Sequence, residues 1–118
     1  MAHEFRFPYP PSVNHYWKPR KGGGKYLSPA ANQFRADVCA NVLPNGFPNL
    51  HGDVCIEVKL YPPSDGKIYD IDNALKALLD ALKYARVYQD DSQVCKLTVW
   101  KFTPLRRGHV EVLIHERL

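Results

Sequence analysis

The chain of 118 residues has no long apolar run and only three cysteines. No stretch approaches the roughly 18 apolar residues of a membrane-spanning helix, and the first residues lack the basic and apolar regions of a signal peptide. We therefore expect a cytoplasmic protein that does not enter a membrane. Cys39, Cys55 and Cys95 are far apart and odd in number, which argues against a disulfide framework or a zinc site and favours buried thiols.

Several ligand-binding signatures are also missing. No glycine-rich loop followed by Lys-Ser or Lys-Thr precedes a helix, which argues against nucleotide hydrolysis and leaves no sign of an organic cofactor. A calcium loop starting at Asp70 would need Gly and Glu at the positions that Leu75 and Ala81 occupy. An aspartyl-phosphate phosphatase would place its acids directly after a buried strand, whereas polar residues precede Asp70.

The excess of positive charge lies near the start of the chain. Basic residues outnumber acidic ones by 16 to 12, for a formal net charge of +4, and residues 1–26 account for the whole excess with five Lys or Arg and one Glu. A basic surface with one acidic focus suits a phosphodiester substrate, because cations hold the phosphates while carboxylates hold a metal ion. A basic domain without such a substrate could have the same charge.

Residue periodicity predicts one domain over residues 1–118, with the element order β-α-β-α-β-β. Alternation of apolar and polar residues predicts strands at 4–9, 52–61, 93–102 and 109–116. A 3.6-residue period predicts helices from Ser28-Pro29 to about Leu43 and from Ala74 to Ala85, the second with Asp72 as its N-cap. We expect an α+β fold with a mixed β-sheet, two helices packed on it, and the last two strands contiguous and antiparallel.

A segment rich in glycine and lysine joins the first strand to the first helix. It cannot pack into a core, because four cations surround three consecutive glycines. We expect a mobile arm that clamps nucleic acid, with its cations on phosphates and aromatics such as Tyr16 free to stack on bases. An inert solvated loop is the alternative. The cations of the arm are Lys18, Arg20, Lys21 and Lys25.

Four aspartates form two pairs that flank the second predicted helix. Asp70 and Asp72 open this helix, and the pair Asp90-Asp91 follows it. Several carboxylates brought together repel one another unless a cation neutralises them. Mg²⁺ prefers carboxylate oxygens and completes its octahedron with water and substrate phosphate. Our hypothesis is that Asp70, Asp72 and Asp91 hold Mg²⁺, with Asp90 as an alternative ligand.

Lys76 lies one turn beyond Asp72 on the same edge of the predicted helix. In the simpler interpretation, Lys76 forms a weak solvated ion pair and Asp72 only caps the helix. Capping does not account for Asp70 or for the later pair. In the functional interpretation, Lys76 stabilises the pentacoordinate phosphate during metal-assisted hydrolysis of a phosphodiester.

Three motifs together resemble the RusA family of Holliday junction resolvases. They are Pro10-Pro11-Ser12-Val13-Asn14, Asp70-Ile71-Asp72-Asn73 with Lys76, and Asp90-Asp91. The resemblance covers roughly residues 7–102. It implies a homodimeric, Mg²⁺-dependent endonuclease of recombination and repair, which resolves four-way junctions by paired symmetric nicks in strands of like polarity. By position it implies catalytic roles for Asp70, Asp72, Lys76 and Asp91. We also expect Asn14 and Lys67 to contact DNA.

One departure from the family and two alternatives remain open. Some members carry a dense arginine run before the first aspartate, whereas residues 64–69 here supply a single lysine. The same acids would serve another metal-dependent nuclease that acts on branched or duplex nucleic acid. A non-catalytic basic module would use them only for capping and salt bridges.

A two-fold pair of chains would place two identical sites on symmetry-related strands, and the strand face bearing Trp100 is a candidate interface.

Overall fold

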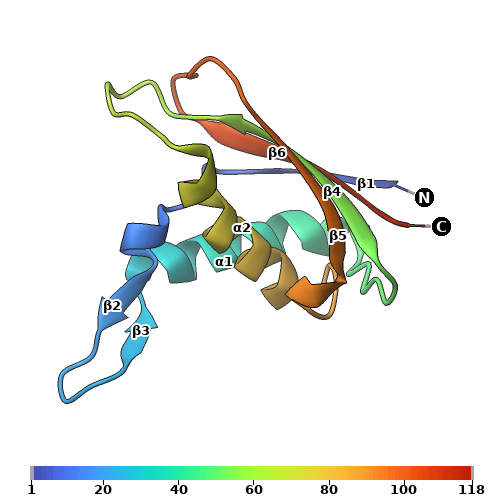
Figure 1. Cartoon of the computed structure of the whole chain (residues 1–118), viewed down its shortest axis with the longest axis horizontal. Coiled ribbons are helices and arrows are strands. Elements are labelled where there is room, and N and C mark those ends of the chain that lie inside the picture. The colour runs from blue at the N-terminus through green and yellow to red at the C-terminus, as the bar shows by residue number, and fades with distance from the viewer. Residues whose placement is uncertain (1, 118) are drawn as a thin grey trace.

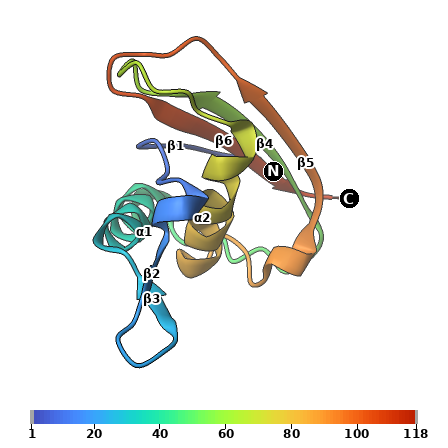
Figure 2. The ribbon, with the colours of Figure 1, turned by 60° about the vertical axis from the view of Figure 1, so that its left-hand side comes forward.

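A four-stranded mixed β-sheet and two helices form most of the computed structural model, which describes residues 2–117 (Figure 1). The strands are β1 (Ala2–Phe7), β4 (Val54–Tyr61), β5 (Val94–Lys101) and β6 (His109–Glu116), in the sheet order β1-β6-β4-β5. The helices are α1 (Pro29–Val42) and α2 (Ile71–Tyr84), and both lie on the same side of the sheet (Figures 1 and 2). The predicted α+β class is confirmed.

The core lies between the two helices and the sheet face that they cover. Alternate residues of β1, β4 and β6 point into it, because successive side chains of a strand point to opposite faces. In the helices the buried positions recur with the 3.6-residue period that the sequence shows. The core residues of the two central strands are Val54, Ile56, Val58, Leu60, Val110, Val112 and Ile114, and the helices add Phe34, Val38, Val42, Leu78 and Leu82.

β4, α2 and β5 form a crossover unit that determines where the acidic pairs lie. β5 pairs with β4 in parallel, and two neighbouring parallel strands require a long connection, here supplied by α2. Asp70 immediately precedes α2, and Asp91 lies in the connection between α2 and β5. The chain therefore places one pair before the helix and the other after it.

The two last strands run in opposite directions but do not pair with each other. β4 lies between them, parallel to β5 and antiparallel to β6. The expectation of contiguous strands was wrong because the segment after β5 bonds across the end of β4. Phe102 N donates to Leu60 O at 2.8 Å, and Leu105 N donates to Pro62 O at 2.9 Å. These bonds carry the chain over β4 before β6 begins.

The observed element bounds lie within two residues of the predicted ones, except at the start of α2. β1 ends at Phe7, because Pro8 has no backbone N–H to donate. The predicted start of α1 is confirmed, with the Ser28 hydroxyl accepting from Ala31 N at 3.1 Å. α2 begins at Ile71 with Asp70 as its N-cap. The prediction of Asp72 as N-cap was wrong, because Asp70 already has the extended backbone of a cap and Asp72 lies inside the first turn.

The glycine- and lysine-rich segment forms a β-hairpin, which sequence analysis did not predict. Its strands are β2 (Trp17–Pro19) and β3 (Lys25–Leu27), paired antiparallel. At its tip Arg20 N donates to Gly24 O at 2.9 Å, and the three glycines have φ values of 89°, 112° and 77°, which other residues rarely adopt. The hairpin projects away from the sheet (Figures 1 and 2).

The cysteines are more accessible than expected. Cys39 and Cys55 are half-buried and Cys95 is exposed, so the prediction of three buried thiols was wrong. Cys55 and Cys95 have their sulfur atoms 4.0 Å apart on the sheet face that the helices leave uncovered. Among residues 2–117, no helix is both long and apolar enough to cross a bilayer.

Candidate functional site

The first acidic pair lies at the N-terminal end of α2. Asp70 and Asp72 are both exposed, and the Asp70 carboxylate makes no capping hydrogen bond to the helix. Among residues 2–117, the one hydrogen bond to its side chain is long, from Asn73 Nδ2 to Asp70 Oδ2 at 3.5 Å. The positive end of the helix dipole favours negative charge here, which offsets part of the repulsion between the two carboxylates. The pair is thus stabilised by its position and still accessible to a ligand.

Lys76 is exposed one turn after Asp72. Among the described residues no salt bridge joins the two, so the ion pair of the simpler interpretation is absent here. The ammonium group therefore lies near the acidic pair without being neutralised by it. An exposed cation in this position is suited to contact a phosphate that the carboxylates approach through a metal ion.

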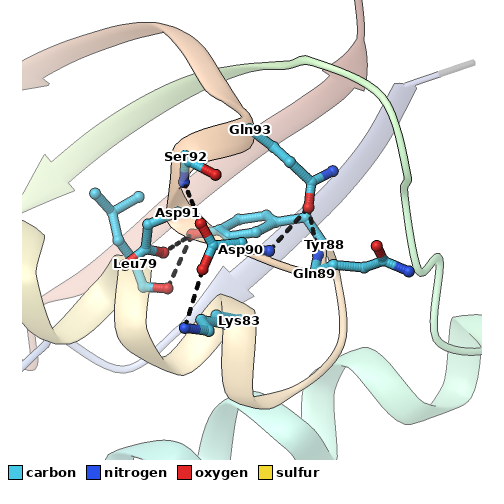
Figure 3. A network of polar contacts seen from close by, with 8 residues as sticks. All are labelled: Leu79, Lys83, Tyr88, Gln89, Asp90, Asp91, Ser92 and Gln93. Atoms are coloured by element: carbon cyan, nitrogen blue, oxygen red, sulfur yellow. Dashed lines mark hydrogen bonds and ion pairs between the residues drawn. The ribbon is translucent and has the colours of Figure 1, made fainter.

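The second pair is embedded in a network of hydrogen bonds (Figure 3). Asp91 opens the short 3₁₀ helix η3 (Asp91–Gln93) and accepts a hydrogen bond at Oδ1 from the Tyr88 hydroxyl, 3.0 Å away. The same hydroxyl is 2.9 Å from Leu79 O in α2. Tyr88 is 1% exposed, and burial, followed by the charge of Asp91, raises the pKa of its hydroxyl. Tyr88 therefore stays protonated and keeps donating.

Both carboxylate oxygens of Asp90 accept hydrogen bonds from the protein itself. Ser92 N donates to Oδ2 at 3.0 Å and Lys83 Nζ donates to Oδ1 at 3.3 Å. The hydrogen bonds from Ser92, followed by that from Lys83, lower the pKa of Asp90 to about 2. Gln93 completes the turn, because its Oε1 accepts from Asp90 N at 2.8 Å. With both carboxylate oxygens bonded, Asp90 has a structural role in this turn.

The structure brings the aspartates together as two pairs rather than as one group of four. The Tyr88 hydroxyl bonds both Asp91 and Leu79 O, so Asp91 lies beside Leu79. Leu79 comes seven residues after Asp72 in α2. At 1.5 Å per residue this corresponds to about 10 Å along the axis of α2. Among residues 2–117, no three His, Cys, Asp or Glu side chains are arranged to hold one metal ion.

Two carboxylates are nevertheless a suitable donor set for Mg²⁺. This ion keeps several of its waters and is commonly held by one or two carboxylates together with substrate phosphates. Asp70 and Asp72 match that pattern, since both are exposed at one helix end. Asp91 joins them as a ligand only if the substrate, a second ion or a second chain bridges the separation.

A cleft of about 570 Å³ opens beside Asp70. It includes two residues predicted to bind DNA, Asn14 and Lys67, and it also includes Arg107, which sequence analysis missed. Arg107 reaches the cleft because Ser64 N donates to Leu105 O at 2.9 Å, which ties its turn to the segment after β4. The adjacent Arg106-Arg107 pair in a Pro- and Gly-bounded turn was the only sequence signal for it. A second concavity of about 430 Å³ lies on the uncovered sheet face and is lined by none of the four aspartates.

The cations of the hairpin are all exposed, as a phosphate-binding surface requires. The Arg20 guanidinium lies 6.0 Å from the centroid of the Tyr26 ring. Trp17 and Tyr26 are 41% and 42% exposed, so aromatic rings are accessible on this hairpin. Lys18, Arg20, Lys21 and Lys25 therefore remain candidates for DNA contact.

Tyr16 does not belong to this accessible surface. Its side chain is 0% exposed, and its hydroxyl donates to the carboxylate of Asp80 in α2. Arg35 forms an ion pair with the same carboxylate at 2.9 Å. The prediction that Tyr16 stacks on bases was wrong, because the ring packs into the core and the hydroxyl finds its partner there. Tyr16 instead fixes the base of the hairpin to α2.

Comparison with known proteins identifies a family. Residues 8–115 match the RusA family, described as endodeoxyribonuclease RusA. A crossover junction endodeoxyribonuclease of Enterobacteria phage HK97 is 30% identical over 115 residues, covering 97% of this chain and 94% of that protein. The protein of the same description from Escherichia coli strain K12 is 31% identical over 117 residues, covering 98% and 95%. That of Enterobacteria phage 82 is 30% identical over the same length and coverage.

Proposed function

The chain belongs to the RusA family of endodeoxyribonucleases, and from this premise we propose that it resolves four-way DNA junctions by paired, symmetric, Mg²⁺-dependent nicks in strands of like polarity. Its relatives are named for cleavage at crossover junctions. The observation that carries the proposal is an exposed carboxylate pair, Asp70 and Asp72, at the edge of a cleft that contains Lys67 and Arg107. Acids for a metal and cations for a phosphodiester thus lie side by side.

In this proposal Asp70 and Asp72 hold Mg²⁺, which when bound supplies positive charge to the phosphate under attack. Lys76 presents its ammonium group one turn further along α2 and stabilises the charge that develops on the phosphate oxygens. The Tyr88 hydroxyl bonds Asp91 Oδ1, and among the described residues Oδ2 has no hydrogen-bond partner. Asp91 is therefore oriented by the protein while one oxygen stays available for the reaction.

DNA contacts in the proposal extend from the cleft to the hairpin. Asn14 lies in the 3₁₀ helix η1 (Val13–His15) at the wall of the cleft, between β1 and the hairpin. Lys67 and Arg107 line the cleft itself. The cations of the hairpin do not line it and come earlier in the chain than Asp70. Phosphate contacts of this kind position the backbone and do not read sequence.

Two observations support a homodimer. β5 is an edge strand, and Leu97 and Trp100 on it are 36% and 43% exposed. An antiparallel pairing of two β5 strands would be two-fold symmetric and would set the start of one strand beside the end of the other. Lys101 Nζ donates to Tyr69 O at 2.9 Å, which holds that end next to Asp70. We propose this pairing because it directs Asp91 of the partner subunit toward Asp70.

Mixed dimers test which chain supplies Asp91. Asp70→Asn and Asp91→Asn chains are each expected to be inactive alone. In a mixed dimer with shared sites, one site carries both substitutions and the other carries none, so single-strand nicking should return. If each chain builds its own site, both sites stay damaged and the mixture stays inactive.

The function itself is tested by cleavage of labelled DNA with and without Mg²⁺. We expect paired nicks in a four-way junction, with little cleavage of a flap or a linear duplex. Equal rates on the three substrates would contradict junction resolution and support a general nuclease. Binding without any cleavage would support a non-catalytic module.

The hairpin is tested by the salt dependence of binding. Replacing Lys18, Arg20, Lys21 and Lys25 by Ala should weaken junction binding and reduce the slope of log K against log salt by up to about 0.9 per lost phosphate contact. Lys59→Ala, an exposed cation on the uncovered sheet face, is the control and should leave the slope unchanged. An unchanged slope in the fourfold variant would show that the hairpin does not bind DNA.

A further inference from the structure

Ile68 is far more exposed than any other large apolar side chain in the described chain. It is 91% exposed, and the next such residue, Leu43, is 60% exposed. A single exposed apolar residue is common on protein surfaces, so exposure alone indicates nothing. The location of Ile68 is what distinguishes it, because the side chain lines the same cleft as Asp70 and lies two residues before it.

The backbone on both sides of Ile68 is held in place. Before it, Lys67 N donates to Asp65 Oδ1 at 3.0 Å. After it, the Tyr69 hydroxyl donates to the same Asp65 carboxylate, and Tyr69 O accepts from Lys101 Nζ at 2.9 Å. The Tyr69 ring also packs edge-on against Tyr9, with centroids 5.4 Å apart. Ile68 is therefore presented outward by a braced segment.

We propose that Ile68 is a wedge that inserts between bases at the branch point of a junction. Apolar side chains that enter a base step unstack it, and this costs least where stacking is already interrupted. A branch point offers such an interruption, whereas a continuous duplex does not. Ile68 would therefore favour junctions over duplexes. This inference rests on the proposed function.

The surroundings of Ile68 agree with this role. Lys67 and Arg107 line the same cleft and can hold the phosphates that flank the unstacked step. Two residues of extended chain span at most about 7 Å, which is close to two base steps of 3.4 Å. The step opened by Ile68 would thus lie within about two nucleotides of the phosphate at Asp70.

The wedge is tested by 2-aminopurine placed at the branch point of a four-way junction, without any metal ion. This base fluoresces more strongly when it is unstacked. We expect wild-type protein to raise the fluorescence, Ile68→Met to retain the rise, and Ile68→Ser to abolish it. In Ile68→Ser, the preference for junction over linear duplex should fall about tenfold, which corresponds to about 1.4 kcal/mol. Duplex affinity should not change.

Leu43→Ser is the matched control, because Leu43 is exposed, follows the end of α1 and does not line the cleft. It should behave as wild type. A fluorescence rise of wild-type size in Ile68→Ser would overturn the wedge. A wild-type protein that cleaves junctions without raising fluorescence would also overturn it and leave the proposed function standing. A wild-type protein that neither binds nor cleaves junctions would instead refute the proposed function.

Discussion

The two acidic pairs that flank α2 are held in opposite ways. Asp70 and Asp72 are exposed and receive, among the described residues, one long hydrogen bond from Asn73. Asp90 and Asp91 are bonded by a buried tyrosine, a lysine and a backbone amide (Figure 3). The first pair is left open to a ligand, whereas the second is oriented by the protein before any ligand arrives.

This difference has an energetic meaning. The open pair relies on the helix dipole to offset its repulsion, so adding a cation there gains free energy that the protein alone does not supply. The bonded pair already has its partners, so its members change little when a ligand binds. Substitutions in the open pair should therefore affect chemistry far more than stability. Substitutions around the bonded pair should affect stability, and those that disturb the orientation of Asp91 should also affect chemistry.

The largest effect is expected at the open pair. Asp70→Asn removes a carboxylate proposed to hold Mg²⁺, and a charge contribution of several kcal/mol corresponds to a cleavage rate about 10³-fold lower. The melting temperature should not change, because the side chain makes no capping bond. Junction binding should persist or tighten, since one negative charge near phosphate is lost. Single-turnover cleavage measures the rate, and filter binding measures the affinity for the junction.

Asp53→Asn is the control for this substitution, since Asp53 is also an exposed aspartate but pairs with Arg117 at 3.0 Å. It should cleave at the wild-type rate. If Asp70→Asn unfolded at a lower temperature and cleaved normally, Asp70 would be a structural cap, and the contrast between the two pairs would disappear.

An intermediate effect is expected at Tyr88, which orients Asp91. Tyr88→Phe removes the hydrogen bonds to Asp91 Oδ1 and Leu79 O without changing the ring. The Mg²⁺ concentration for half-maximal cleavage should rise about 10- to 100-fold. Metal affinity typically falls by this factor when a residue that hydrogen-bonds a metal ligand is removed. Losing these hydrogen bonds should also lower stability by about 0.5–1.5 kcal/mol.

Tyr16→Phe separates orientation from stability. Like Tyr88, Tyr16 is a buried tyrosine whose hydroxyl donates to an aspartate, in this case Asp80 of α2. It should lower stability comparably and leave the Mg²⁺ requirement unchanged. Equal Mg²⁺ requirements in the two variants would mean that Tyr88 acts only through stability.

Local features of this chain could be predicted from the sequence, because they depend on neighbouring residues. The 3.6-residue period of α2, the Ser28-Pro29 start of α1 and the alternation in β4 all follow from local spacing. Asp70 and Asp72 were placed near each other for the same reason. The N-cap was assigned to the wrong one of them, because aspartate suits both positions.

Features that depend on distant partners could not be predicted. Tyr16 is buried because of Asp80, which lies 64 residues later. β5 and β6 are separated because the turn after β5 bonds to the end of β4. Arg107 enters the cleft through the same turn. The hairpin was missed because glycines and cations indicate a solvated segment, without indicating that its two arms pair.

The smallest effect is expected at Asp90, and it concerns acid stability. Hydrogen bonds from Ser92, followed by that from Lys83, lower the pKa of Asp90 from 3.8 to about 2 in the folded protein. A lowered folded pKa stabilises the fold above the unfolded pKa, and this contribution is lost as the pH falls through the folded pKa. The melting temperature of wild type should therefore exceed that of Asp90→Asn by a small, constant amount above about pH 5. The difference should vanish between pH 3.8 and about 2.

Because both oxygens of Asp90 are already bonded, the Mg²⁺ requirement of this variant should match that of wild type, in contrast to Asp70→Asn. A higher Mg²⁺ requirement in Asp90→Asn would show that Asp90 acts like the open pair, as a metal ligand that gives up its bond to Lys83 when the metal binds.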